Sequence, residues 1–490
     1  MTFAASRRDD RGSFFRSGLS HPRAMIREGL SCYAGDSSDV AATKRPTRDA
    51  VKSLLRALAS GSSGSMALAQ TLLVRFLTLG LNVLTGVLVA RYLGPVGRAE
   101  QAAILLGAGL FPFLVSFGLP YAVQYKIRTD PNRASEIVSA GTVLAIAFGL
   151  IACVAGIFIV PHMLAQYSAT IVFAAQLAML TAPLAMLYAL LCGVLQAGHQ
   201  FRETNFTRYA MPVSTLLILL GLVVGHALNP ISSAVAYLAA VLWAVPWLWV
   251  KVSPRLRITG LQQATRGLVS YGSRSYVSEI LGTLVAQVDQ VLVIGLLSPS
   301  SMGLYTVAIG AARAVDLFSG STVAVLFPRA ASLEHAQIVE LTGRAARITS
   351  AMLLATSVGL IALMPLLLPL FYGQAFKAAV PVAQVIVVSI ALNAVVYILA
   401  QAYMAAGRPG INALIQLVGL ATTVPAMLLL IPRYALLGAA SALVISTIVR
   451  LLFLLACFPI ALNTPIPSLL LNAGDVLYVR RSLARQMRGK

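Results

Sequence analysis

The chain has 490 residues, of which 58% are hydrophobic and only 11% charged, and its mean hydropathy is +0.83. Soluble domains average about 45–50% apolar and about 25% charged residues, so the composition excludes a soluble globular protein and indicates a polytopic membrane protein. The formal charge of +21 does not indicate nucleic-acid binding, because the Lys and Arg residues lie in the two tails and at the ends of apolar segments. The four cysteines are scattered and match neither a disulfide framework nor a metal site.

Residues 1–65 differ in kind from the rest of the chain. They are rich in Arg, Gly and Ser and have little apolar periodicity, which predicts a disordered basic cytoplasmic tail. At its end, residues 49–60 place their apolar side chains on one helical face and predict a short interfacial helix. Met25 and Met66 are alternative starts, so the purpose of this tail stays open.

About twelve apolar segments follow, each near or above the roughly 20 residues that a bilayer-spanning helix needs. We predict them at 66–91, 101–124, 136–160, 170–196, 205–227, 232–250, 274–297, 301–328, 347–371, 379–405, 411–432 and 435–459. Basic loops alternate with short loops that hold one Lys between them. The positive-inside rule therefore predicts that both termini are cytoplasmic.

The chain contains an internal repeat at an offset of 204 residues. VLVARYLGPVGRAE (87–100) aligns with VLVIGLLSPSSMGL (291–304), and QAGHQF (196–201) aligns with AAGRPG (405–410) at nearly the same offset. Since six spans separate the copies, the halves run parallel, and such repeats place a transport site between them. We predict an all-α membrane protein with two pseudo-symmetric six-helix bundles around a central cleft. The predicted parts are the tail 1–65, a first bundle at 66–251, a basic cytoplasmic linker at 252–273, a second bundle at 274–460 and a basic cytoplasmic tail at 461–490.

A polar stripe marks the first span. Its members recur at intervals of four and three residues, which keeps them on one helical face: Thr71, Arg75, Thr78, Asn82 and Thr85. The offset carries this stripe to the seventh span, where Glu279 and Asp289 take the places of Arg75 and Thr85. If the halves face each other, a cationic and an anionic wall meet across one cleft. A structural contact or snorkelling to the cytoplasmic side is the alternative for Arg75.

The charged residues Asp289, Arg313 and Asp316 lie within the predicted spans of the second bundle. A carboxylate at the membrane centre costs roughly 2.5–3.5 kcal/mol on insertion scales, so Asp289 must face a wet or protein-lined interior. It is the best candidate for coupling to an ion gradient, because a buried carboxylate changes charge with its surroundings. Arg313 and Asp316 lie one turn apart and form either a local ion pair or part of the cleft.

Catalytic signatures are not apparent in the sequence. It shows no phosphate-binding loop, no paired His and acid at metal spacing and no nucleophile elbow. We therefore expect a transporter rather than an enzyme, without a cofactor. Its energy would come from a proton or sodium gradient, the membrane potential or the substrate's own gradient.

Several stretches together resemble the polysaccharide flippases of the MOP exporter superfamily. They are VARYLGPVGRAEQAAIL (89–105), VDQVLVIGLLSPSSMGLYTVA (288–308), FPRAASL (327–333), LFYGQAFKAAVPVAQVI (370–386), AAGRPG (405–410) and IPRYALLGAASALV (431–444). The family's Asp in the seventh helix matches Asp289, and its Gly-x-Tyr matches Gly303 and Tyr305. Two features depart from the family pattern, namely Ala99 where a Gly is usual and the long N-terminal tail.

This resemblance implies a flippase of the bacterial cytoplasmic (inner) membrane that moves an undecaprenyl-pyrophosphate-linked oligosaccharide by ion- or potential-coupled alternating access, for O-antigen or exopolysaccharide synthesis. Its partners would be this lipid-linked substrate, membrane lipids and glycan polymerase or assembly proteins. Arginine is a planar donor suited to phosphate, and amides and hydroxyls suit a glycan. The expected substrate-binding residues are Arg75, Thr78, Asn82, Gln287 and Arg313, and the expected ion-coupling residues are Asp289, Glu279 and Asp316.

Three alternatives stay open. A MATE-type exporter of small cations would favour acids over arginines in its cleft. A peptidoglycan-precursor lipid flippase resembles a pattern of fourteen spans rather than twelve. A membrane-embedded glycan polymerase or ligase needs a long external loop, whereas the external loops here have about ten residues or fewer.

Overall fold

The computed structural model describes residues 64–252, 261–315 and 335–469, with residues 472 and 475. Side chains of 64–75, 274, 275, 278, 335 and 336 are not described within these ranges. The predicted interfacial helix at 49–60, the FPRAASL stretch and Asp316 lie outside the described residues. In the part of the chain that is described, all regular secondary structure is helical, which confirms the predicted all-α class.

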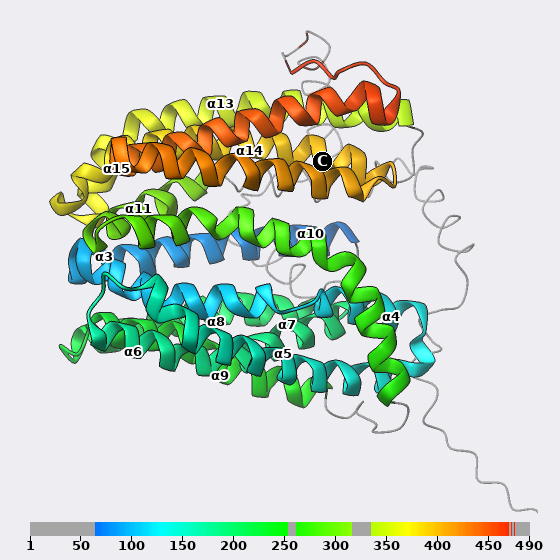
Figure 1. Ribbon diagram of the computed structural model, residues 1–490, viewed down its shortest axis with the longest axis horizontal. Helices are drawn as coiled ribbons and strands as arrows, with labels where there is room; N and C mark the ends of the chain where they lie inside the picture. Colours follow the sequence, from blue (N-terminus) through cyan, green and yellow to red (C-terminus); the bar gives the residue numbers. More distant parts are fainter. Residues whose placement is uncertain (1–63, 253–260, 316–334, 470–471, 473–474, 476–490) are drawn as a thin grey trace, which may run out of the picture.

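Figure 1 shows the helices, most of which run side by side along the long axis of the molecule. In chain order they are α3 (Gly64–Leu114), α4 (Leu119–Thr129), η1 (Pro131–Arg133), α5 (Ala134–Met163), α6 (Ala169–Ala178), η2 (Met179–Thr181), α7 (Ala182–Ala197), α8 (Phe201–Val224), α9 (Pro230–Val252), α10 (Leu261–Leu296), α11 (Pro299–Ala312), η4 (Arg313–Val315), α13 (His335–Tyr372), η5 (Gln374–Ala379), α14 (Val380–Ala405) and α15 (Pro409–Leu462).

Nine stretches of the described helices are long and apolar enough to cross a bilayer. Two of them break their helical geometry, at Gly94 (φ 67°) in α3 and at Ala435 (φ 47°) in α15, so each comprises two spans. These two divisions, together with the shorter α11, bring the number to twelve and confirm the predicted count. Gly94 suits its position, because a residue without a Cβ atom adopts a positive φ without steric cost.

The chain forms two helical lobes joined by α10. The first lobe comprises α3 to α9, and the second comprises α11 to α15, on opposite sides of α10 in Figure 1. Helix α10 contacts α4 and α5 of the first lobe and α15 of the second. It begins at Leu261, within the predicted linker 252–273, because Ala264 and Leu268 bury their side chains in the core of the first lobe.

The two lobes share an apolar core at only one end of the molecule. One cluster of buried residues draws on both lobes and surrounds the turns near Gly94, Ser298, Gly373 and Ala435. We call this the closed end. Toward α4, η1 and the turns at 198–200 and 406–408, each lobe has its own separate core among the described residues. We call this the open end. Because packed apolar cores resist separation, this arrangement closes the molecule at one end only.

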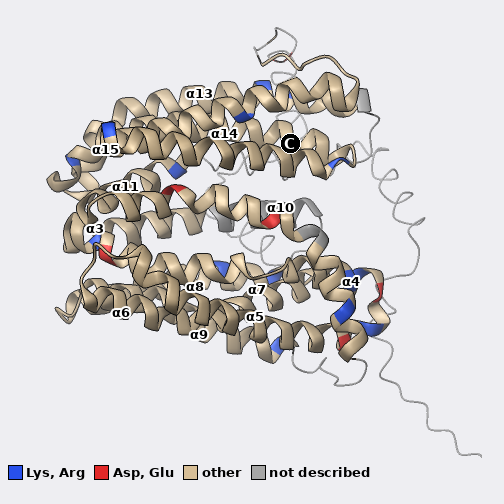
Figure 2. Cartoon of the chain, in the orientation of Figure 1, with Lys and Arg blue, Asp and Glu red and all other residues tan. Residues whose placement is uncertain are grey.

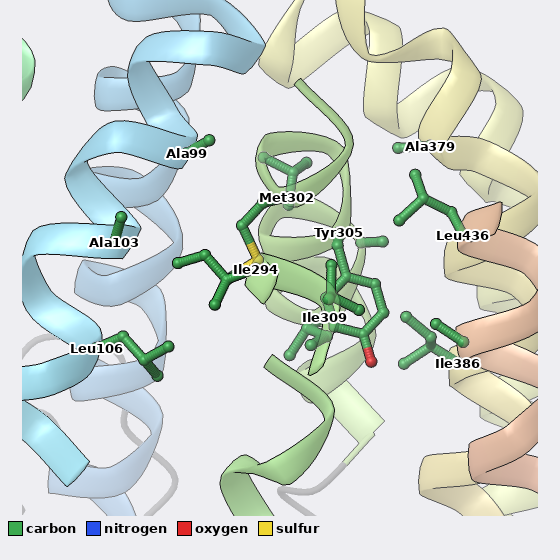
Figure 3. Packing of buried hydrophobic residues seen from close by; sticks show 14 of the residues in the cluster. Ala99, Ala103, Leu106, Ile294, Met302, Tyr305, Ile309, Ala379, Ile386 and Leu436 are labelled. Carbon is green, nitrogen blue, oxygen red and sulfur yellow. The ribbon is translucent and has the colours of Figure 1, made fainter. Parts of the chain in front are cut away.

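Close backbone packing seals the closed end. A Cβ atom at Gly303, in α11, would lie 1.8 Å from the carbonyl oxygen of Pro95 in α3, so the two helices touch at the backbone. Figure 3 shows Ala99 of α3 on one side of Met302 and Tyr305, with Ala379 and Leu436 of the second lobe on the other. Met302 and Tyr305 are fully buried there.

Basic side chains gather at the open end, beside α4 in Figure 2. Those at this end in the described chain include Lys126, Arg128, Arg133, Arg202, Lys251, Arg266 and Arg408. The C-terminal segment also folds back there, where Arg347 of α13 donates hydrogen bonds of 2.6 and 3.0 Å to the Asp475 carboxylate. These bonds hold the pKa of Asp475 below its usual value.

Candidate functional site

A cavity of about 380 Å³ lies between the lobes, and we call it the deep chamber. Its walls come from α3, α9, α10, α11 and the end of α13. The polar side chains that line it are Asn82, Thr85, Arg98, Tyr237, Gln287, Gln290, Thr306, Arg313 and Tyr372. Amide, hydroxyl and guanidinium groups thus face a space in the membrane-spanning part of the protein, and none of the described residues that line it is acidic.

Two arginines give the deep chamber its positive charge. Arg98 donates a hydrogen bond to the Gln101 side chain, while its buried Nε has no partner among the described residues. Arg313 follows the end of α11 in the turn η4, and its side chain is exposed to the chamber. A guanidinium carries five donors in a planar fork, and most of the donors of this pair have no partner among the described residues, so they can bind an anion.

A second cavity of about 600 Å³ continues from the deep chamber toward the open end, and we call it the outer chamber. Leu105, Gly109 and Tyr237 line both cavities, so the two lie next to each other, and we call them together the cleft. The polar lining of the outer chamber consists of Tyr121, Gln124, Thr181, Tyr188, Gln196, Arg208, Tyr237 and Glu279. This lining contains one carboxylate and one guanidinium, in contrast to the deep chamber.

A third cavity of about 260 Å³ lies inside the second lobe, between α10, α14 and α15, and we call it the lobe cavity. Asp289 lines it and is only 7% exposed. The Tyr305 hydroxyl donates a 2.9 Å hydrogen bond to Asp289 Oδ2. The other oxygen, Oδ1, is buried without a partner in the described chain.

Arg450 of α15 brings a positive charge into the same lobe cavity. It is 6% exposed and donates a hydrogen bond to the Asn393 side chain, and its Nε has no partner among residues that the structure describes. Asp289 and Arg450 are thus two buried charges of opposite sign that line one cavity, each with an unsatisfied atom. Burying a charge is costly unless it is paired, so both residues are candidates for function.

The structure brings part of the predicted site together. Asn82, Gln287 and Arg313 all line the deep chamber. Thr78 does not, and its hydroxyl is buried without a partner in the described chain. Arg75 lies in α3, but its side chain is outside the description.

The expected meeting of a cationic and an anionic wall across one cleft is wrong for Asp289. Gln287 and Gln290 of α10 face the deep chamber, whereas Asp289 faces the lobe cavity. Two residues along an α-helix turn the side chain by about 200°, so Gln287 and Asp289 point in opposite directions. Glu279 does line the cleft, but in the outer chamber.

The structure adds two functional candidates to those predicted from the sequence. Arg98 is not a member of the polar stripe predicted in the first span. Its spacing to Ala102, Leu105 and Gly109, which line the same chamber, is the helical pattern that reveals it. Arg450 is a lone charge in the apolar stretch 435–459, and a mid-membrane charge is by itself a signal of function.

Comparison with solved structures defines the class of the fold. The chain is similar to the lipid II flippase MurJ in an inward closed conformation, with a TM-score of 0.70 and 13% identity over 84% of this chain and 89% of that one. It is also similar to a multidrug resistance MATE family transporter of the MOP superfamily, in an inward-facing conformation (TM-score 0.66, 12% identity, 79% and 95% covered) and in an outward-facing conformation (0.59, 12%, 86% and 99%). The chain therefore has the fold of MOP superfamily transporters.

The family follows from the sequence model that matches the chain. Residues 88–381 match the family described as polysaccharide biosynthesis protein, and this chain belongs to that family. The predicted kinship is thereby confirmed. No curated protein sequence matches the chain significantly.

Proposed function

We propose that this protein is a flippase that moves a lipid-linked oligosaccharide, carried on undecaprenyl pyrophosphate, across the membrane by alternating access. Family membership and the transporter fold support this function. The observation that carries it is the pair of arginines, Arg98 and Arg313, in a deep chamber that continues to one end of the molecule.

The chemistry of the deep chamber suits a pyrophosphate. Arginine binds phosphate oxygens in a bidentate manner, and in a low-dielectric site such charge-assisted bonds are stronger than in water. The neighbouring Asn82 and Gln287 can bind further oxygens. The polyprenyl chain can stay in the lipid while the head group occupies the cleft. The cationic deep chamber disfavours a small cation as the transported molecule.

The charge distribution supports an orientation with the open end in the cytoplasm. Basic residues concentrate at the open end, and cytoplasmic loops carry the excess of Lys and Arg. Both termini then lie in the cytoplasm of a bacterial cell, and the protein resides in the inner membrane. In this orientation the cleft loads from the leaflet where lipid-linked glycans are built, and polymerases or assembly proteins act on the delivered glycan.

Transport requires no chemical step on the substrate and no cofactor in this proposal. Asp289 is the proposed coupling residue, because one of its oxygens is buried and unpartnered in the described chain. The positive charge of Arg450 in the same cavity disfavours a bound sodium ion and favours a proton as the coupling ion. Glu279 and Asp316 keep the coupling role only as sequence predictions.

A vesicle assay tests the flippase function. Vesicles with the purified protein and an undecaprenyl-pyrophosphate oligosaccharide ending in galactose are treated externally with β-galactosidase, which cannot cross the membrane. The wild type should expose the inner-leaflet glycan, and Arg313→Ala should not. Arg433→Ala, an exposed arginine outside the chambers, is the matched control. If the wild type exposes the inner-leaflet glycan no faster than vesicles that contain the lipid-linked oligosaccharide but no protein, the proposal is rejected. Efflux of a fluorescent cationic drug without glycan exposure would instead favour the exporter.

The coupling role of Asp289 has its own test. In the same vesicles, an imposed proton gradient should accelerate glycan exposure by the wild type but not by Asp289→Asn. A variant that retains the full response to the gradient would remove Asp289 from the coupling step.

A further inference from the structure

The outer chamber differs from the deep chamber in a way that the movement of a pyrophosphate does not explain. It contains the carboxylate of Glu279, and a carboxylate repels phosphate. Its volume of about 600 Å³ falls within the roughly 300–1,000 Å³ that ligand pockets usually occupy. This part of the cleft therefore suits a ligand group other than the pyrophosphate.

Glu279 is half-buried at the wall of the outer chamber. Its Oε2 is buried without a partner in the described chain. The residue belongs to α10, whereas the rest of the outer chamber belongs to the first lobe. Because Glu279 is only half-buried and lines the outer chamber, its carboxylate can accept a hydrogen bond from a ligand that is bound between α10 and the first lobe.

The rest of the lining is typical of carbohydrate recognition. Tyr121 is 60% exposed and offers an aromatic face to the C–H groups of a sugar ring. Gln124 and Gln196 offer amide donors and acceptors, and Arg208 offers donors. A neutral group with many hydroxyls satisfies the carboxylate, amides and guanidinium together, whereas a simple cation is repelled by Arg208 and an anion by Glu279.

We propose that the outer chamber binds the saccharide nearest to the pyrophosphate, with Glu279 accepting hydrogen bonds from its hydroxyl or amide groups. This inference rests on the proposed flippase function and divides the cleft into two parts. The deep chamber recognises the pyrophosphate, and the outer chamber recognises the sugar. Glu279 and Tyr121 then decide which glycans are accepted, whereas Arg313 serves every lipid pyrophosphate.

A binding comparison with two probes tests the division. The full-length protein in nanodiscs is titrated with undecaprenyl pyrophosphate and with undecaprenyl-pyrophosphoryl-N-acetylglucosamine. Glu279→Gln and Tyr121→Ala should each weaken binding of the sugar-bearing probe by roughly tenfold or more, as the loss of a charge-assisted hydrogen bond or a ring contact predicts. Both should bind undecaprenyl pyrophosphate as the wild type does, and this retained affinity also shows that the variants fold.

Two further variants complete the test. Arg313→Ala should weaken the binding of both probes. Glu340→Gln, which changes an exposed carboxylate of α13, should weaken the binding of neither. If Glu279→Gln weakens the binding of both probes equally, or of neither, the sugar-binding role of the outer chamber is overturned while the flippase proposal stands. If the wild type binds neither probe, the flippase proposal falls, and the inference falls with it.

Discussion

Gly303 has no room for a side chain, because a Cβ atom there would lie 1.8 Å from the carbonyl oxygen of Pro95. The two residues belong to the equivalent turns of the two halves, since the offset of 204 pairs Pro95 with Pro299 and Ala99 with Gly303. Ala99 is fully buried and tolerates its methyl group. The contact joins the lobes at the closed end.

Gly303→Ala should therefore weaken the closed end. The new methyl group meets backbone atoms that cannot move aside as a flexible side chain would, and overpacking of this kind costs about 1–3 kcal/mol. Thermal unfolding in detergent should show a lowered Tm. Gly359→Ala is the control, because a Cβ atom there has nothing within 4 Å. If Gly303→Ala and Gly359→Ala have the same Tm, the close contact between Gly303 and Pro95 does not stabilise the closed end.

Arg98→Gln should reduce affinity for undecaprenyl pyrophosphate by about 10- to 100-fold, since charge-assisted hydrogen bonds contribute roughly 1.5–3 kcal/mol. Arg98→Lys should recover only part of it, because an ammonium lacks the planar fork. Titration in nanodiscs measures both. Arg91→Gln, an exposed residue of the same helix, should bind normally, and an unchanged affinity in Arg98→Gln would place the phosphate elsewhere.

Tyr305→Phe should destabilise the second lobe by about 1–3 kcal/mol. The substitution removes the 2.9 Å hydrogen bond to Asp289 and leaves a buried acceptor without its donor. Chemical unfolding followed by fluorescence measures the loss. In an Asp289→Asn background the same substitution should cost less, because a neutral amide oxygen is a weaker acceptor than a carboxylate. Equal costs in both backgrounds would argue against a charged Asp289.

Asp289→Asn and Arg450→Met should each destabilise more than their combination does. Each single change leaves one unbalanced buried charge in the lobe cavity, whereas the double variant leaves none. Melting temperatures of the wild type, both single variants and the double variant form the required cycle. Simple additivity of the two single effects would show that the charges do not interact across the cavity.

Acid should release the C-terminal segment from α13. Arg347 lowers the pKa of Asp475, so the pair stabilises the folded segment above the ordinary carboxyl pKa of about 3.9. This stabilisation is lost as the pH falls through the lower pKa of the folded state.

Spin labels at positions 408 and 466 should report this release as a broadened distance distribution, at low pH for the wild type and already at pH 7 for Asp475→Asn. Glu340→Gln should behave as the wild type at pH 7, because it removes only the exposed pair with Arg344 and leaves the contacts of Arg344 and Arg347 with Asp475 in place. A narrow distribution for Asp475→Asn at pH 7 would contradict the role of the pair.

The sequence by itself determined the membrane class, the twelve spans and the duplicated halves. Burial in lipid demands long apolar helices, and helical periodicity already places Asn82 on a polar face and Phe76, Leu77 and Leu84 on a lipid-facing one. The last three are indeed exposed on the surface of the protein.

Only the tertiary structure decided which polar side chains share a cavity. Periodicity predicts which face of its own helix a side chain lies on. It does not predict which other helix packs against that face. Asp289 lines the lobe cavity together with Arg450 and does not line the cleft. Arg98 of the first lobe and Arg313 of the second lobe line the same deep chamber. These pairings depend on how helices far apart in the chain pack together, which no local pattern encodes.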